Sequence, residues 1–140
     1  MTLFDLLVLS ETRLWNHVGM VARDRLGLPL TDLFALRAIA TREGEGRVDD
    51  LRTDLGVTVG AASKLVDRLV SAAVVERVPH PTDRRSSLLR LTPAGVDLAQ
   101  ETAEVIDREL AVVFADEDPG DLAVVAAVLE RASAQREVVR

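Results

Sequence analysis

The stretch that decides the fold is Glu76 to Thr92, which reads ERVPHPTDRRSSLLRLT. Pro79 and Pro81 disfavour a helix there, so this stretch predicts a turn between two strands. The tip of the turn carries Arg84 and Arg85. Guanidinium groups suit phosphates and the narrow minor groove of DNA, although a solvated basic loop has the same composition. The two strands are indicated by apolar residues on either side of the tip: Val74, Val75 and Val78, then Leu88, Leu89 and Leu91.

The residues before this hairpin predict a helix-turn-helix. A short helix from Val48 to Leu55 is followed by a tight turn at Gly56, and Thr58 is placed to cap a second helix that runs to about Ala73. An ordinary amphipathic helix in a bundle is the alternative. The hairpin that follows directly favours the winged form instead. The inward positions expected for the second helix are Ala62, Leu65, Val66 and Leu69.

The opposite face of this second helix is small, polar and basic, which suits the major groove of DNA. Small residues let a helix backbone approach the floor of the groove, and Ser63 and Lys64 then reach base edges or phosphates. Arg68 is equally suited to a phosphate or a base, and Asp67 is expected to pair with a neighbouring arginine. The residues expected to face DNA from this helix are Thr58, Gly60, Ala61, Ser63, Lys64 and Arg68, with Arg47, Arg52 and Thr53 as weaker phosphate candidates.

The rest of the chain reads as helices. Thr2 to Leu26 predicts a long helix with more apolar surface than one small domain covers, which indicates an oligomer interface. Thr31 is expected to cap the next helix, in which Leu33, Leu36, Ile39 and Ala40 would be buried. Thr92 and Pro93 begin a long helix to about Ala115, and Asp118 and Pro119 begin the last one.

Composition limits the possible functions. The 140 residues suffice for one domain, and the net charge is −6. Residues 58–92 nevertheless carry six arginines and lysines against three acidic residues, a local excess of three positive charges.

With no cysteine, disulfides, thiol redox sensing and thiolate metal sites are excluded, and we expect neither metal nor cofactor. We expect a cytoplasmic protein, because the N-terminus resembles neither a signal peptide nor a membrane span. No nucleophile pairs with a base, so we expect no enzyme.

The order of these elements resembles the MarR family of winged helix-turn-helix regulators. The segment Asp83–Thr92 matches the wing signature of the family: Asp, any residue, Arg, five residues, then Leu-Thr. The segment Ala62–Leu69 is similar to its recognition helix, and Val75–Arg77 to its entry into the wing. The resemblance implies a mainly α fold with a small β-wing. It also implies one domain over residues 1–140, with dimerisation helices in 1–30 and 93–140 and a winged helix-turn-helix in 31–92.

The resemblance also implies a function. Proteins of this family are usually homodimeric repressors that bind a pseudo-palindromic duplex with half-sites roughly one helical turn, ~10 bp, apart. By the match to the signature, Arg85 enters the minor groove, Asp83 braces it and Arg84 contacts a phosphate. The residues alone do not separate Arg84 from Arg85. The competing function is a winged-helix module for protein–protein interaction that has lost specific DNA binding.

Many members of the family release DNA when a small aromatic ligand binds between the two layers. By resemblance such a pocket would draw on the first helix, the second helix and the start of the fifth. The residues there that suit an aromatic acid are Trp15, His17, Met20, Phe34 and Arg37, each of which also fits an ordinary structural role. The chain departs from the family at Ala73, where a glycine is usual. Alanine resists the left-handed conformation by about 1 kcal/mol, so either the helix ends differently or this turn is strained.

Overall fold

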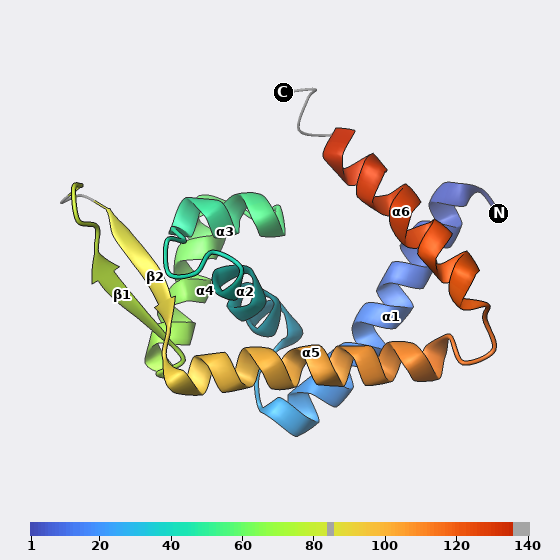
Figure 1. The fold of residues 1–140 in the computed structure, drawn as a ribbon, viewed down its shortest axis with the longest axis horizontal. Coiled ribbons are helices and arrows are strands. Elements are labelled where there is room, and N and C mark those ends of the chain that lie inside the picture. The colour runs from blue at the N-terminus through green and yellow to red at the C-terminus, as the bar shows by residue number, and fades with distance from the viewer. Residues whose placement is uncertain (84–85, 136–140) are drawn as a thin grey trace. The chain divides into compact units, whose positions relative to one another are not determined.

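The computed structural model describes residues 1–83 and 86–135, which form two compact units that meet within one helix, at Asp107. The described part is mainly α with a small two-stranded wing, so the expected fold class is confirmed (Figure 1). Its elements are α1 (Leu3–Leu26), α2 (Leu30–Ala40), α3 (Val48–Leu55), α4 (Val59–Ser71), β1 (Val75–Pro79), β2 (Ser87–Leu91), α5 (Pro93–Val113) and α6 (Pro119–Gln135).

Helix α2 is the centre of the first unit. It contacts α1, α3, α4 and β2, and its side chains Leu33, Ala35 and Leu36 are completely buried (Figure 1). A helix with neighbours on several sides needs apolar residues around most of its circumference, which α2 has. The elements that carry the candidate DNA-facing residues are therefore fixed on one aliphatic core.

The start of α2 differs from the expectation. Pro29 occupies the N-cap position and the helix begins at Leu30, so the expected cap at Thr31 is wrong. The side chain of Leu30 is buried, and this burial draws the residue into the first turn. The hydroxyl of Thr31 instead donates to its neighbour Asp32. The expected burial of Ala40 is also wrong, because the last turn of α2 leaves it exposed.

The hairpin β1–β2 is antiparallel, with Val75 opposite Leu91 and Pro79 opposite Ser87. Proline is tolerated at this position because it ends an edge strand. One side of the hairpin lies on the core, where Val75 and Leu89 are buried, and Leu88 is buried on the opposite side. The loop after α2 adds a short bridge, in which the N–H of Leu89 donates to the carbonyl of Gly46 at 2.7 Å.

Helix α1 begins with a capping box and ends at a glycine. The Thr2 hydroxyl accepts from the Asp5 N–H, the Asp5 carboxylate accepts from the Thr2 N–H, and Gly27 closes the helix with a φ of 74°. The N-terminal half of the helix leaves its apolar side chains exposed: Leu3, Phe4, Leu6, Leu7, Val8 and Leu9. Among the described residues, none of the helices combines the length and apolar character needed to cross a membrane.

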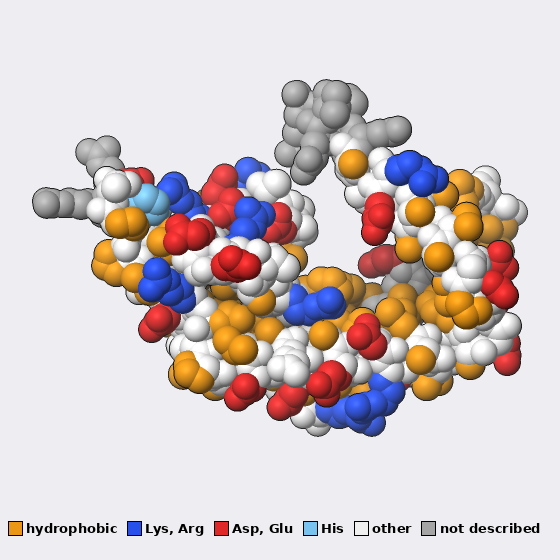
Figure 2. Space-filling view, in the orientation of Figure 1, with side chains coloured by type: hydrophobic (Ala, Val, Ile, Leu, Met, Phe, Trp, Pro, Cys, Tyr) orange, Lys and Arg blue, Asp and Glu red, His pale blue; other side chains and the backbone are white. Residues whose placement is uncertain are grey.

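The second unit contains the end of α5 and helix α6. Asp118 caps α6 as expected, because its carboxylate accepts from the Gly120 N–H at 2.7 Å. Helix α6 leaves apolar side chains exposed, and Figure 2 shows apolar side chains along this helix. The exposed ones are Val124, Val125, Val128 and Leu129.

Candidate nucleic-acid interface

Helix α4 is presented by the helix-turn-helix that the sequence predicts. Gly56 ends α3 with a φ of 64°, and the Thr58 hydroxyl caps α4 by accepting from the Ala61 N–H at 3.2 Å. The helix ends at Ser71, two residues before the expected boundary. All four residues expected to face inward are buried, which confirms the orientation of the helix: Ala62, Leu65, Val66 and Leu69.

The outer face of α4 carries the candidate DNA contacts. Thr58, Gly60, Ala61 and Lys64 are exposed, and Ser63 is half-buried. A Cβ placed at Gly60 would meet nothing within 4 Å, so this part of the helix is a low ridge with open space around it. Lys64 makes no hydrogen bond or ion pair within the described part of the chain. A low ridge that ends in an unpaired cation suits a groove lined by phosphates.

The guanidinium of Arg68, one turn beyond Lys64, is held by a buried carboxylate that the sequence analysis did not connect with it. Its Nη2 and Nε donate to the two carboxylate oxygens of Asp32 at 2.7 and 3.1 Å. The Asp32 side chain is 3% exposed and that of Arg68 54%. The hydrogen bond from Arg68 raises the pKa of its guanidinium further above the ordinary value. The candidate contact at Arg68 is thus a guanidinium with a fixed position.

Asp67, the neighbour of Arg68 on α4, pairs with the wing. Arg77 on β1 donates to its carboxylate at 2.8 Å, so the pairing expected for Asp67 is confirmed. Both side chains are largely exposed, and ion pairs of this kind contribute little to stability. The pair does connect α4 with the first strand of the hairpin.

The tip of the wing is described only in part. Asp83 is exposed at the end of the described segment, whereas Arg84 and Arg85 lie outside the described residues. The proposed entry of Arg85 into the minor groove, its bracing by Asp83 and the phosphate contact of Arg84 therefore stay predictions. The two strands that carry the tip are fixed by their register on the core.

The junction of α4, β1 and α5 explains how the wing is aimed. Ala73 has a φ of 57°, so of the two alternatives at this position the strained left-handed turn is the one observed. The Thr92 hydroxyl donates to the Ala73 carbonyl at 2.8 Å and accepts from the Gly95 N–H at 3.1 Å. A Cβ at Gly95 would lie 1.9 Å from the Val74 carbonyl oxygen, so only glycine fits there. The junction thus fixes where β1 leaves α4 and where α5 begins.

Comparisons with known proteins agree with this geometry. A family model described as the MarR family matches residues 26–86. The multiple antibiotic resistance protein MarR of Escherichia coli is 34% identical over 61 residues, which are 44% of this chain and 42% of that protein. Residues 26–86 are therefore similar to the MarR family. The sequence match thus spans less than half the length of this curated relative.

Solved MarR structures resemble a larger part of the chain. A cysteine-to-serine mutant of Escherichia coli MarR in complex with operator DNA has a TM-score of 0.81 at 21% identity, covering 93% of this chain and 92% of that one. A Bordetella bronchiseptica BpsR structure, titled for regulation of its DNA binding by 6-hydroxynicotinic acid, has a TM-score of 0.82 at 20% identity, covering 94% and 93%. At these identities the likeness establishes the MarR winged-helix fold over nearly the whole chain.

The base of the wing holds a contact that the sequence did not indicate. The Nε2 atom of His80 lies 2.6 Å from Nη2 of Arg47, the residue that precedes α3. The other ring nitrogen of His80 accepts from the backbone N–H groups of Thr82 and Asp83 at 3.3 and 3.1 Å. His80 therefore orders the start of the wing tip, and nothing in the local sequence distinguishes it from an exposed loop histidine.

The weaker phosphate candidates on α3 are occupied by partners. Arg52 donates to Asp49 at 2.7 Å, and this hydrogen bond lowers the pKa of the Asp49 carboxyl below its usual range. The Thr53 hydroxyl donates to the carbonyl of Asp49. Basic and acidic side chains therefore alternate around α3, as Figure 2 shows. Any DNA contact from α3 has to compete with these local pairs.

The expected ligand residues do not line one pocket. Trp15 and Phe34 pack with their ring centroids 5.4 Å apart, and the guanidinium of Arg37 lies 5.8 Å from the Phe34 ring centroid. Trp15 and Met20 line a separate groove on α1 of about 540 Å³. His17 has a contact within the described chain but lines neither that groove nor the cleft described below. Aromatic packing between α1 and α2 involves two of the five residues, and their expected role in holding a ligand stays a prediction.

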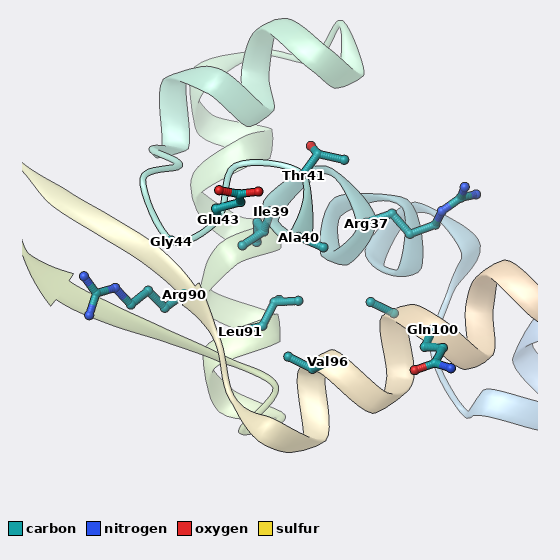
Figure 3. Close-up of a pocket in the computed structure, with 11 residues that line it drawn as sticks. Arg37, Ile39, Ala40, Thr41, Glu43, Gly44, Arg90, Leu91, Val96 and Gln100 are labelled. Carbon is teal, nitrogen blue, oxygen red and sulfur yellow. The ribbon is translucent and has the colours of Figure 1, made fainter.

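A cleft of about 640 Å³ lies where α2, β2 and α5 meet, and Arg37 alone of the five expected residues lines it (Figure 3). In Figure 3, Ile39, Leu91 and Val96 occupy the middle of the cleft, while Arg37 and Arg90 extend from its two ends. Helix α1 contributes no residue to the lining of this cleft. The sequence analysis did not predict Arg90 and Gln100 as residues of this cleft, because their position beside α2 depends on how β2 returns past the loop after α2.

Proposed function

We propose that the chain is a homodimeric, sequence-specific DNA-binding transcription regulator that acts as a repressor. The observation that carries this proposal is the outer face of α4, which combines small residues with the unpaired cation of Lys64 beside a wing fixed on the same core. In the proposal α4 enters the major groove and the wing arginine, Arg85, enters the minor groove. The match of residues 26–86 to the MarR family supports it.

The test is DNA binding by fluorescence anisotropy across a salt series. The probes are a duplex from upstream of the chain's own gene and an unrelated duplex. Sequence-preferring binding that weakens steeply with salt supports a regulator, because phosphate contacts release counterions. Arg85→Ala should weaken specific binding by about 1–3 kcal/mol. Equal, weak binding to both duplexes calls for selection from genomic fragments, and absence of preference there would contradict the proposal.

The competing function, a winged-helix module for protein–protein interaction, makes a different prediction for the same surface. A module relieved of DNA binding has no physical need for a local excess of positive charge in residues 58–92. Such a module would also lack a steep salt dependence with duplex DNA. The anisotropy series therefore separates the two functions.

The homodimer is proposed from the exposed apolar side chains of α1. Leu3 and Phe4 are 73% and 72% exposed, and further apolar residues follow them along the same helix half. Continuous apolar surface of this kind marks association sites on soluble proteins. Sedimentation analysis should give a dimer, and Phe4→Glu should shift it toward monomer. A wild-type chain that stays monomeric at high micromolar concentration would contradict this part of the proposal.

Release of DNA by a small aromatic acid is proposed for the cleft between α2, β2 and α5. The apolar middle suits an aromatic ring, and the arginines at its ends suit a carboxylate. Benzoate is the simplest probe. It should weaken DNA binding by the wild type, and Arg37→Ala should abolish that effect while Arg23→Ala, in the separate groove on α1, keeps it. DNA binding that stays unchanged at high concentrations of benzoate and its hydroxylated analogues would contradict the proposed release by an aromatic acid.

A further inference from the structure

We propose that Asp32 is a positioning residue that fixes the guanidinium of Arg68 for reading DNA sequence. This inference rests on the proposed function, because it concerns how α4 distinguishes one duplex from another. Asp32 lies in the first turn of α2 and Arg68 on the outer face of α4, 36 residues apart. The pair therefore joins the buried first turn of α2 to the surface of α4 that is assigned to DNA.

The geometry is that of a bidentate pair. Nη2 of Arg68 donates to Oδ1 of Asp32 at 2.7 Å and Nε donates to Oδ2 at 3.1 Å, so the plane of the guanidinium is set by the carboxylate. Oδ1 also accepts from the Thr31 hydroxyl at 3.3 Å. The carboxylate sits at the N-terminal end of α2, where the helix dipole favours a negative charge. Asp32 is therefore held from two sides before DNA arrives.

The distribution of exposure indicates what the pair does. Asp32 is almost completely buried, whereas the side chain of Arg68 is about half exposed. A guanidinium has five N–H donors, and the carboxylate uses only two of them. Lys64 lies four residues earlier, which places it on the same face of α4 as Arg68. Arg68 thus keeps free donors on the outer face of α4 while its orientation is locked from inside.

A locked guanidinium favours sequence reading over general attraction. Recognition of guanine by arginine requires two parallel hydrogen bonds at fixed positions, and a side chain already ordered loses less entropy on binding. The charge of Asp32 also offsets that of Arg68, so the pair adds little to non-specific attraction for phosphates. Lys64, which has no partner among the described residues, supplies that attraction instead.

The second aspartate–arginine pair on α4 provides the matched control. Asp67 pairs with Arg77 at 2.8 Å, but its side chain is 68% exposed. Asp67→Asn and Asp32→Asn each remove one negative charge from the same helix surroundings. Both changes should strengthen the electrostatic attraction of the protein for DNA. Only Asp32→Asn also removes the buried carboxylate that holds the guanidinium of Arg68.

The experiment measures the ratio of affinities for a selected duplex and an unrelated duplex at one salt concentration, with thermal unfolding recorded for each variant. Asp32→Asn should lower this ratio about tenfold without weakening the binding of unrelated DNA. Asp67→Asn should keep the ratio within about twofold of wild type. If Asp32→Asn does not fold, Arg68→Lys decides, because it keeps the charge and loses the bidentate geometry. It should also lower the ratio about tenfold.

The outcomes are distinguishable from failure of the proposed function. A folded Asp32→Asn with an unchanged ratio, or with equal losses on both duplexes, would overturn the inference and leave the regulator intact. The double variant Asp32→Asn with Arg68→Ala should lose no more than the single variants do, and additive losses would overturn it as well. A wild-type protein that does not discriminate between duplexes overturns the proposed function and this inference together.

Discussion

Thr92 and Ala73 lie 19 residues apart and are joined by a hydrogen bond of 2.8 Å from the threonine hydroxyl to the alanine carbonyl. The same hydroxyl accepts from the Gly95 N–H, so one side chain fixes both the exit of α4 and the start of α5. Between these points the chain makes the wing. The direction in which the wing leaves the core is thus controlled by a junction of small residues.

Ala73→Gly should stabilise the protein. Ala73 has a φ of 57°, a conformation that costs a non-glycine residue about 1–2 kcal/mol, whereas glycine loses about 0.5–1 kcal/mol in additional chain entropy. The expected net gain is up to about 1 kcal/mol, measured by urea unfolding. Ala72→Gly, at a φ of −79°, is the control and should give no gain. A destabilised Ala73→Gly would show that the left-handed turn is not strained.

Gly95→Ala should destabilise the protein and disturb the wing. Its Cβ would lie 1.9 Å from the Val74 carbonyl oxygen, so α5 has to shift, at a cost of about 1–3 kcal/mol. Gly60→Ala is a helical control with open space around the new methyl group, and it should be neutral or stabilising. The two unfolding midpoints check this prediction. Equal midpoints would mean that the junction around Val74 yields without strain.

Lys64→Ala should weaken binding to all duplexes similarly. Lys64 is exposed and unpaired among the described residues, so it is available to a phosphate. Loss of one phosphate contact should reduce the slope of log affinity against log salt by about 1. Arg131→Ala, which removes an exposed cation from α6, should leave the slope unchanged. An unaltered slope for Lys64→Ala would place this face of α4 away from the phosphates.

Asp49 should contribute to stability above about pH 4 and lose this contribution in acid. Its hydrogen bond from Arg52 lowers the pKa of the folded carboxyl below the unfolded value, so the folded state holds its proton less tightly. The stabilisation is present above the unfolded pKa and disappears as the pH falls through the folded pKa. Asp49→Asn should therefore lose less stability than wild type between pH 5 and pH 3 in thermal unfolding. If the stability of both proteins fell equally over this pH range, the stabilising pair of Asp49 with Arg52 would be contradicted.

The features that arise from the order of neighbouring residues could be predicted from the sequence. The spacing of Ala62, Leu65, Val66 and Leu69 gives the buried face of α4, and the prolines with the flanking apolar runs give the hairpin. Both signals arise from periodicity and from the loss of a backbone donor at proline. The cap of α2 was predicted wrongly because the burial of Leu30, a tertiary effect, outweighed the capping preference of Thr31.

Contacts across large sequence separations were not predictable in this way. The pairing of Asp32 with Arg68 depends on how α2 crosses α4, and the cleft with Arg37 and Arg90 depends on where β2 returns. A single aspartate in the first turn of a helix ordinarily indicates only a favourable interaction with the helix dipole. Its role here follows from burial, which sequence spacing does not encode.

The most direct test of the central claim is selection of bound duplexes from a random library by the purified protein. A regulator that reads DNA with α4 and the wing should enrich a two-fold symmetric sequence whose half-sites lie about 10 bp apart. Binding to that sequence should exceed binding to unrelated DNA by about 1,000-fold or more at physiological salt. A library that shows no enrichment after repeated rounds, from a folded protein, would contradict the account.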